Sequence, residues 1–302
     1  MNRQMLCIAM ALVVCMVPST VHARLRVVAT VSDLGALVRE VTGDDADVVV
    51  LASPDLDPHY VDGKPSFLVA LSRADILVVN GMDLEIGWLP PLLANARNSA
   101  VQVGGAGYLD ASQFVHKLEV PGRVDRSMGD IHVGGSPHYL FDPRAAAAVI
   151  MGIAERCAQL DSANAAKYQG RANASAGELL QYAAQQKLVF QSLAPKSRSV
   201  VVYHRSIAYV ADWLGLQVAM EVEPKPGVAP DPARVAAVLQ TMRAHSIDVL
   251  VQEVYYPKNT MRQLANLTGA KIIEIAGGPR EGESYLNRIK RYVEPLYAAL
   301  AN

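Results

Sequence analysis

Residues 25–41, LRVVATVSDLGALVREV, combine a strand pattern with a helix pattern. Leu25–Thr30 is a short apolar run with β-branched residues, which is typical of a buried strand. Ser32 then offers an N-cap for a helix over Asp33–Val41. A near-continuous apolar strand that leads into a helix indicates a parallel sheet whose two faces are covered by helices.

This alternation recurs along much of the chain. Further strands are predicted at Asp47–Leu51, Ile76–Asn80, Val101–Gly104, Ser199–Tyr203, Gln217–Val222, Asp248–Val254 and Lys271–Ile275. Further helices are predicted at Pro65–Arg73, Glu85–Ala96, Ile207–Leu214, Pro232–His245, Asn259–Thr268 and Glu283–Leu300.

The middle of the chain lacks strand patterns. Ala145–Leu160 is helical in pattern, and Ala163–Leu193 predicts one helix of roughly 45 Å, the alternative being two helices kinked near Gly170 or Gly177. We therefore predict an α/β fold of two lobes, each with a mostly parallel sheet flanked by helices, joined by one long rigid helix. The expected divisions are an N-terminal lobe over residues 24–142, linking helices over 143–195 and a C-terminal lobe over 196–302.

Composition excludes several classes of protein. The 302 residues are 51% hydrophobic and 19% charged, which argues against disorder and fits a globular chain with a sizeable core. The formal net charge of −1 leaves no basic surplus for nucleic acid, so we expect no nucleic-acid partner. We also expect the protein to be a monomer. Cys157 lies in an apolar-periodic stretch and is expected to be a buried thiol.

The first 23 residues have the pattern of a cleaved secretory signal. Arg3 supplies a positive charge, Met5–Val17 is an apolar run too short for a stable membrane anchor, and Ala23 suits signal peptidase. Neither Cys7 nor Cys15 follows the small residue that a lipoprotein cleavage site needs. We expect a periplasmic protein without a lipid anchor.

Three histidines occupy positions where ligands gather in parallel sheets. His59 follows Asp57-Pro58 beyond a predicted strand, His204 ends another, and His138 follows Pro137 in a glycine-rich segment. If the three met across a cleft between lobes, their neutral imidazoles would suit Zn²⁺. Spacing alone leaves open that each histidine is simply a satisfied polar group.

The other histidines are weaker candidates. His245 ends a helix, and His116 is expected in a surface loop. His132 lies six residues before His138, and we retain it as an accessory ligand or a loop residue. The proline-rich segment Glu221–Gly227 is expected to form a rigid turn at the cleft rim without a direct role in the site.

Several segments that follow one another along the chain form a recognisable set. They are Val28-Ala29-Thr30 with Asp33-Leu34 and Gly43-Asp44, Leu56-Asp57-Pro58-His59, Asn80-Gly81-Met82-Asp83-Leu84-Glu85, Ser136-Pro137-His138-Tyr139-Leu140-Phe141-Asp142-Pro143, Tyr203-His204 with Gly215-Leu216, and Gly269 with the closing helix. Together they resemble the metal-ion solute-binding proteins of zinc and manganese ABC importers, and the resemblance extends nearly to the end of the chain.

The resemblance implies a metal bound between two lobes by His59, His138 and His204. A histidine at position 204 resembles the zinc-type subgroup, whereas manganese binders have glutamate there, so Zn²⁺ is the expected cargo and Mn²⁺ a weaker one. The implied partners are an ABC transporter permease in the inner membrane and, as an open alternative, a periplasmic zinc metallochaperone.

One departure from the family leaves the fourth ligand open. The family commonly has an aspartate in the loop after the last strand, and Ala276–Glu281 contains none. Glu253 at the end of a strand is the first candidate, with Glu281 and water as the others. The alternative for Glu253 is a carboxylate that orients a histidine through its other ring nitrogen.

These features predict a non-enzymatic receptor that captures Zn²⁺ and delivers it to the permease. The rival from another class is a secreted zinc-dependent hydrolase, in which Glu253 would act as general base. Ligands from two lobes leave little room for substrate, which argues against it. A metal-binding adhesin or metallochaperone would use the same site.

Overall fold

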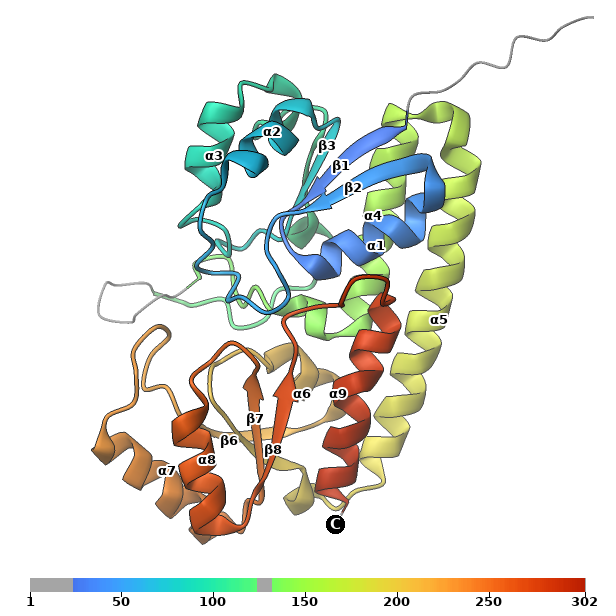
Figure 1. Cartoon of the computed structure of the whole chain (residues 1–302). Helices are drawn as coiled ribbons and strands as arrows, with labels where there is room; N and C mark the ends of the chain where they lie inside the picture. Colours follow the sequence, from blue (N-terminus) through green and yellow to red (C-terminus); the bar gives the residue numbers. More distant parts are fainter. Residues whose placement is uncertain (1–23, 124–131, 302) are drawn as a thin grey trace, which may run out of the picture.

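Two sheets of four parallel strands form the two lobes (Figure 1). The computed structural model describes residues 24–123 and 132–301, so the predicted signal peptide lies outside the described residues. The spatial strand order is β2-β1-β3-β4 in the N-terminal lobe and β6-β5-β7-β8 in the C-terminal lobe. The strands are β1 (Leu25–Ala29), β2 (Ala46–Val50), β3 (Ile76–Val79), β4 (Tyr108–Asp110), β5 (Ser199–Val202), β6 (Gln217–Glu221), β7 (Val249–Glu253) and β8 (Lys271–Ile275). The predicted fold class is confirmed.

Helices connect the strands and cover the sheets. Asp231 caps α7, because its side chain accepts a hydrogen bond from the backbone N–H of Arg234. Ser32, in contrast, is the first residue of α1 and makes no capping bond. The α-helices are α1 (Ser32–Thr42), α2 (Pro65–Arg73), α3 (Leu89–Ala96), α4 (Pro143–Leu160), α5 (Ala165–Gln191), α6 (Ala208–Leu214), α7 (Pro232–His245), α8 (Lys258–Thr268) and α9 (Tyr285–Leu300).

Two predicted elements of the N-terminal lobe are wrong. The apolar run Val101–Gly104 forms turns that expose Val103, and the edge strand is Tyr108–Asp110 instead. The chain turns there because Gly105 packs so closely on the carbonyl of Ala100 that a Cβ would lie 2.4 Å from it. The helix predicted from Glu85 begins only at Leu89, since the prolines that follow Leu89 are tolerated only in a first helical turn.

The helix α5 runs beside both lobes (Figure 1). It is one continuous helix of 27 residues, so the alternative of two kinked helices is excluded. Near its start, Arg171 donates to the carbonyl of Thr42 (2.7 Å) and to Asp45 (2.8 Å) in the N-terminal lobe. Further along, the carbonyl of Ala183 accepts a hydrogen bond from the indole of Trp213 in the C-terminal lobe. The helix is therefore fastened to each lobe separately.

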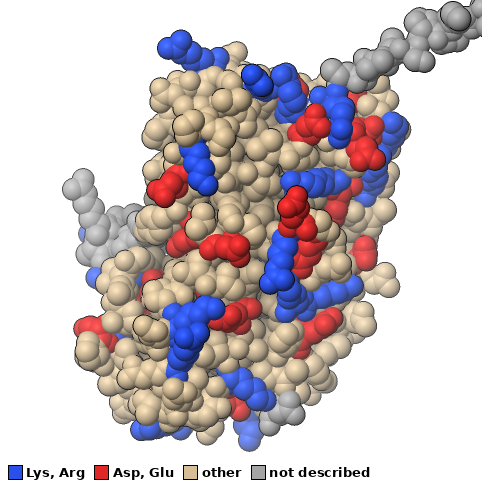
Figure 2. All heavy atoms as spheres, viewed as in Figure 1, with Lys and Arg blue, Asp and Glu red and all other residues tan. Residues whose placement is uncertain are grey.

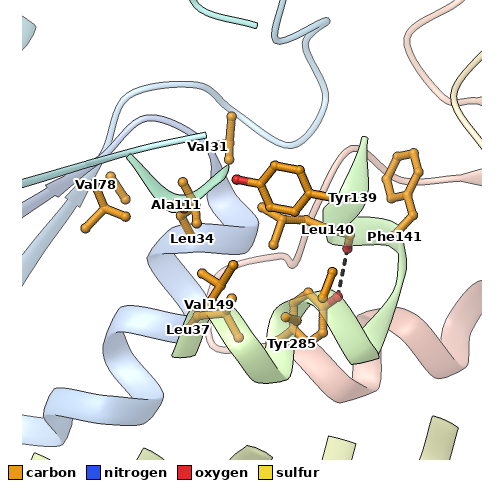
Figure 3. Close-up of a cluster of buried hydrophobic side chains, with 14 of the residues drawn as sticks. Val31, Leu34, Leu37, Val78, Ala111, Tyr139, Leu140, Phe141, Val149 and Tyr285 are labelled. Carbon is orange, nitrogen blue, oxygen red and sulfur yellow. Dashed lines mark hydrogen bonds between the residues drawn. The ribbon is translucent and has the colours of Figure 1, made fainter. Parts of the chain in front are cut away.

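One hydrophobic cluster extends through both lobes. This cluster includes residues 139–141, which form a short 3-10 turn before α4. Figure 3 shows Tyr139 beside Val31 of the N-terminal lobe, while Tyr285 of α9 donates a hydrogen bond to the carbonyl of Leu140. A core shared in this way couples the two lobes.

A buried arginine joins the same region. Arg288 of α9 donates to the carbonyls of Leu140 (3.3 Å) and Ala276 (3.0 Å), and its guanidinium lies over the ring of Phe141. Its Nε atom is 3.6 Å from the carboxylate of Asp33 in the N-terminal lobe. Both side chains are almost completely buried, so water cannot solvate either charge in place of its partner.

The charged surface and the buried thiol of Cys157 agree with the expectations from the sequence. On the face in Figure 2, acidic and basic side chains are interspersed, without a broad field of one sign. Cys157 is buried in α4, and burial raises the pKa of its thiol to about 12. Across residues 24–123 and 132–301, no helix is both long and apolar enough to cross a membrane.

We expect Arg288→Met to lower the free energy of unfolding by about 3–5 kcal/mol, because it leaves the carboxylate of Asp33 buried without its counter-charge. Urea unfolding of the metal-free protein measures this. Lys258→Met is the control, since Lys258 pairs with Glu274 at the surface and its loss should cost less than about 1 kcal/mol. Equal costs for the two variants would contradict the interpretation.

The pH dependence of stability should report on Asp33. Burial raises the pKa of this carboxyl from 3.8 to about 6, against the opposing charge of Arg288. The folded state therefore binds the proton more tightly, and the contribution to stability is present at low pH and is lost as pH rises towards 6. Asp33→Asn should remove about 3 kcal/mol of this decline between pH 4 and 7, measured by urea unfolding. Parallel pH profiles of the two proteins would refute the assignment.

Candidate metal site

The structure brings His59, His138 and His204 together between the lobes. One ring nitrogen of each lies within 4.8 Å of the others. His59 is in the turn after β2, His138 precedes the 3-10 turn before α4, and His204 directly follows β5. His138 and His204 are buried and His59 is partly buried, so a small ion between them would be largely shielded from solvent.

An aspartate orients the ring of His59. The carboxylate of Asp57 lies 2.6 Å from Nδ1 and also accepts the backbone N–H of His59. Burial alone would raise the pKa of Asp57, but the hydrogen bonds and charge of His59 outweigh it and hold the pKa below its usual range. Asp57 is therefore an anion that keeps the proton on Nδ1 and leaves the Nε2 lone pair available for a metal.

A glutamate has the same role at His204. The carboxylate of Glu223 lies 2.6 Å from Nδ1 of His204, and both side chains are buried. Burial lowers the pKa of His204, but the bond to Glu223 and the charges of nearby carboxylates raise it overall. The segment Glu221–Gly227, expected to have no direct role in the site, thus contributes Glu223, which contacts the candidate ligand His204. The parallel pairing of β5 with β6 brings Glu223 to His204. The pairing extends beyond the strands, where the N–H of Glu223 bonds to the carbonyl of Tyr203.

Among the described residues, no carboxylate bonds to the ring of His138. Its Nε2 atom is buried without a hydrogen-bond partner among the described residues, and its ring stacks on Phe141. Burial, followed by the neighbouring histidines, lowers the pKa of His138 well below its usual value. The ring is therefore neutral at physiological pH, which is the form that binds a metal.

Glu253 is buried at the end of β7, near the histidines. Its two carboxylate oxygens have no hydrogen-bond partner among the described residues, and burial raises its pKa against the opposing charge of His204. It does not belong to the group of ligand atoms within 4.8 Å of one another. Glu281 is exposed to solvent.

The remaining histidines separate into two groups. His132 lies beside the cluster, with its Nε2 atom 3.1 Å from Nε2 of His59. Its ring also approaches that of His138, at 6.4 Å between centroids. His116 and His245 are exposed and take no part in the cluster.

The loop after β8 packs tightly on the N-terminal lobe. A Cβ at Gly277 would lie 2.5 Å from the carbonyl of Pro54, and one at Gly278 would lie 2.0 Å from the hydroxyl of Ser32. Neither position has room for a side chain without a shift of the neighbouring lobe. This close approach is a physical reason for the absence of an aspartate at either glycine.

Four pockets border the histidines, the smallest of them, about 30 Å³, beside His138. The largest, about 440 Å³, is lined by His132, His138 and His204. A second of about 350 Å³ borders His59 and His132, and a third of about 260 Å³ borders His59 and His204. An ion of atomic size therefore has access to the cluster without separation of the lobes.

Comparison with known proteins identifies the family to which the chain is similar. The family model described as ZnuA, zinc-uptake complex component A, periplasmic, matches residues 27–299. The metal ABC transporter substrate-binding lipoprotein SsaB of Streptococcus sanguinis is 22% identical over 292 residues, covering 94% of this chain and 91% of that protein. The manganese ABC transporter substrate-binding lipoprotein PsaA of Streptococcus mitis is 22% identical over 287 residues, covering 92% and 90%.

The fold agrees with the sequence comparison. A crystal structure of ZnuA aligns with a TM-score of 0.77 at 22% identity, covering 92% of this chain and all of that one. The family match extends over nearly the whole chain after the predicted signal peptide, and both lobes and the histidine cluster lie within it. The chain therefore belongs to the ZnuA family of metal-binding substrate receptors of ABC transporters.

Proposed function

We propose that this protein is a periplasmic zinc receptor, which binds Zn²⁺ through His59, His138 and His204 and delivers it to an ABC permease. The observation that carries the proposal is the convergence of three imidazoles, two of which are oriented by carboxylates. Zinc in proteins is bound at about 2.0–2.1 Å by neutral imidazole nitrogens, usually with four ligands. Receptor function follows from the family, and we propose no enzymatic role.

The choice of zinc over manganese rests on the donor atoms. Nitrogen donors suit Zn²⁺, whereas Mn²⁺ prefers carboxylate and carbonyl oxygens. Relatives such as PsaA are named for manganese, so family membership alone does not select the metal. The two oriented imidazoles of His59 and His204 present nitrogen, not oxygen, to the ion, and this favours zinc.

For the fourth position we propose Glu253. Its buried oxygens have no hydrogen-bond partner among the described residues, and its raised pKa reflects the cost of a buried charge that a cation would relieve. With Asp57 and Glu223 it would bring three carboxylates to balance the dication. Water and His132 are the competing occupants, since His132 already lies beside His59.

The cellular setting follows from the family and the N-terminal sequence. A receptor of this family works outside the cytoplasm, and its partner is the membrane permease. SsaB and PsaA are named lipoproteins, whereas we propose a cleaved signal without a lipid anchor, because large residues precede Cys7 and Cys15 here.

Calorimetric titration of metal-stripped protein with Zn²⁺ and Mn²⁺ tests the proposal. We expect one tight zinc equivalent, at least tenfold weaker manganese binding, and loss of most zinc affinity in His204→Ala. Glu253→Gln should weaken zinc binding while it retains the three-histidine site. His245→Ala is the matched control, since that histidine is exposed on α7. Manganese binding as tight as zinc, or unchanged binding by His204→Ala, would refute the zinc site.

Glu223→Gln should weaken zinc binding by roughly 10–100-fold, because a neutral amide holds the Nδ1 proton of His204 less firmly than a carboxylate does. The same calorimetric titration measures it. Glu274→Gln serves as the control, since Glu274 pairs with Lys258 at the surface. A Glu223→Gln variant that binds zinc as tightly as this control would show that the carboxylate does not support the ligand.

A further inference from the structure

We propose that Asn80 is a positioning residue for His138, and so does for this ligand what Asp57 and Glu223 do for the other two. His59 and His204 each have a carboxylate on Nδ1, at 2.6 Å in both cases. Among the described residues no carboxylate bonds to the ring of His138, so the stacking of that ring on Phe141 and the backbone on either side of it have to set its orientation. The effect on metal affinity rests on the proposed zinc function, whereas the effect on the ring does not.

Asn80 holds both neighbours of His138. Its side-chain Nδ2 donates to the carbonyl of Pro137 (3.0 Å), and its own carbonyl accepts the hydroxyl of Tyr139 (2.6 Å). All of these groups are buried. One residue thus fixes the chain before and after the ligand.

Asn80 is itself held by a buried carboxylate. Glu85 accepts the N–H of Asn80 (2.6 Å) and the N–H of Gly81 (3.1 Å), and it accepts the hydroxyl of Thr30 at the end of β1. The Thr30 hydroxyl also lies 3.2 Å from the N–H of Asn80. Asn80 is therefore tied to the carboxyl ends of β1 and β3, the rigid part of the N-terminal lobe.

The turn between Asn80 and Glu85 is strained in a way that fits this role. Gly81, Met82 and Asp83 have φ values of 78°, 50° and 60°, although Met82 and Asp83 carry side chains that rarely adopt this region. Such strain persists only where surrounding contacts hold it, and it is concentrated at functional sites. The carboxylate of Asp83 also accepts the N–H of Val133, so the turn supports the segment that leads to His138.

Asn80→Asp tests the proposal, because it keeps the shape of the side chain and removes the Nδ2 donor, which bonds to the carbonyl of Pro137 and, at 3.3 Å, to that of Gly81. NMR of ring-labelled histidine in metal-free protein reads the His138 ring directly, with its signal identified by loss in His138→Ala. We expect one sharp His138 signal in the wild type, and a shifted and broadened or doubled signal in Asn80→Asp. Zinc titration of the same variant should give a Kd raised roughly tenfold or more.

Tyr139→Phe provides a second variant that leaves Asn80 in place and removes the other hydrogen bond. It should perturb the His138 signal in the same direction, and it decides the proposal alone if Asn80→Asp does not fold. Asn98→Asp is the matched control, since Asn98 Nδ2 donates to the carbonyls of Leu71 and Ala74 in the same lobe, away from the histidines. It should lower stability and leave the ring signal and zinc affinity unchanged.

Two results would overturn the proposal. One is an unchanged His138 signal in Asn80→Asp and Tyr139→Phe, and the other is an equal change in Asn98→Asp, which would indicate a general loss of lobe stability. A wild type that binds no zinc would refute the proposed function instead, and the ring signal would still decide whether Asn80 positions His138.

Discussion

The carbonyl groups of Leu140 and Phe141 are buried just before α4, where no helix can satisfy them, and α9 of the opposite lobe supplies the donors. Tyr285 and Arg288 bond to Leu140, and Tyr292 bonds to Phe141. A buried carbonyl without a partner costs several times the value of a made hydrogen bond, so the chain near His138 has to remain against α9. This constraint places one ligand at the boundary of the lobes and makes both lobes depend on it.

The other two ligands are positioned by one lobe each. His59 follows β2 with Asp57 beside it, and His204 follows β5 with Glu223 beside it. Each pair combines an imidazole that can bind a cation with a carboxylate that selects its tautomer. In the proposed site, two carboxylates therefore orient His59 and His204, and Asn80 holds the backbone on either side of His138.

Sequence patterns predicted most of the strands and helices because these depend on local periodicity, whereas the choice of His59, His138 and His204 came from the resemblance to a family and not from their spacing. The supports depend on pairing between strands, which no local pattern contains. Glu223 reaches His204 only because β6 lies beside β5 in parallel register. Asn80 reaches Pro137 across 57 positions of sequence. The strand predicted at Val101–Gly104 does not form, because the tight packing of Gly105 turns the chain there and outweighs the β-propensity of the two valines.

The same contacts limit how the protein can exchange its ion. Separation of the lobes would break the bonds from α9 to Leu140, pull Gly277 from the carbonyl of Pro54, and expose the Arg288 and Asp33 pair. Each of these buried interactions opposes opening, and α5 is fastened to both lobes. The pockets that already reach the histidines offer a path that leaves these contacts intact. If His59, His138 and His204 bind the ion as proposed, exchange through these pockets requires movement of their rings, and we expect the residues that orient the rings to influence how long a metal is held.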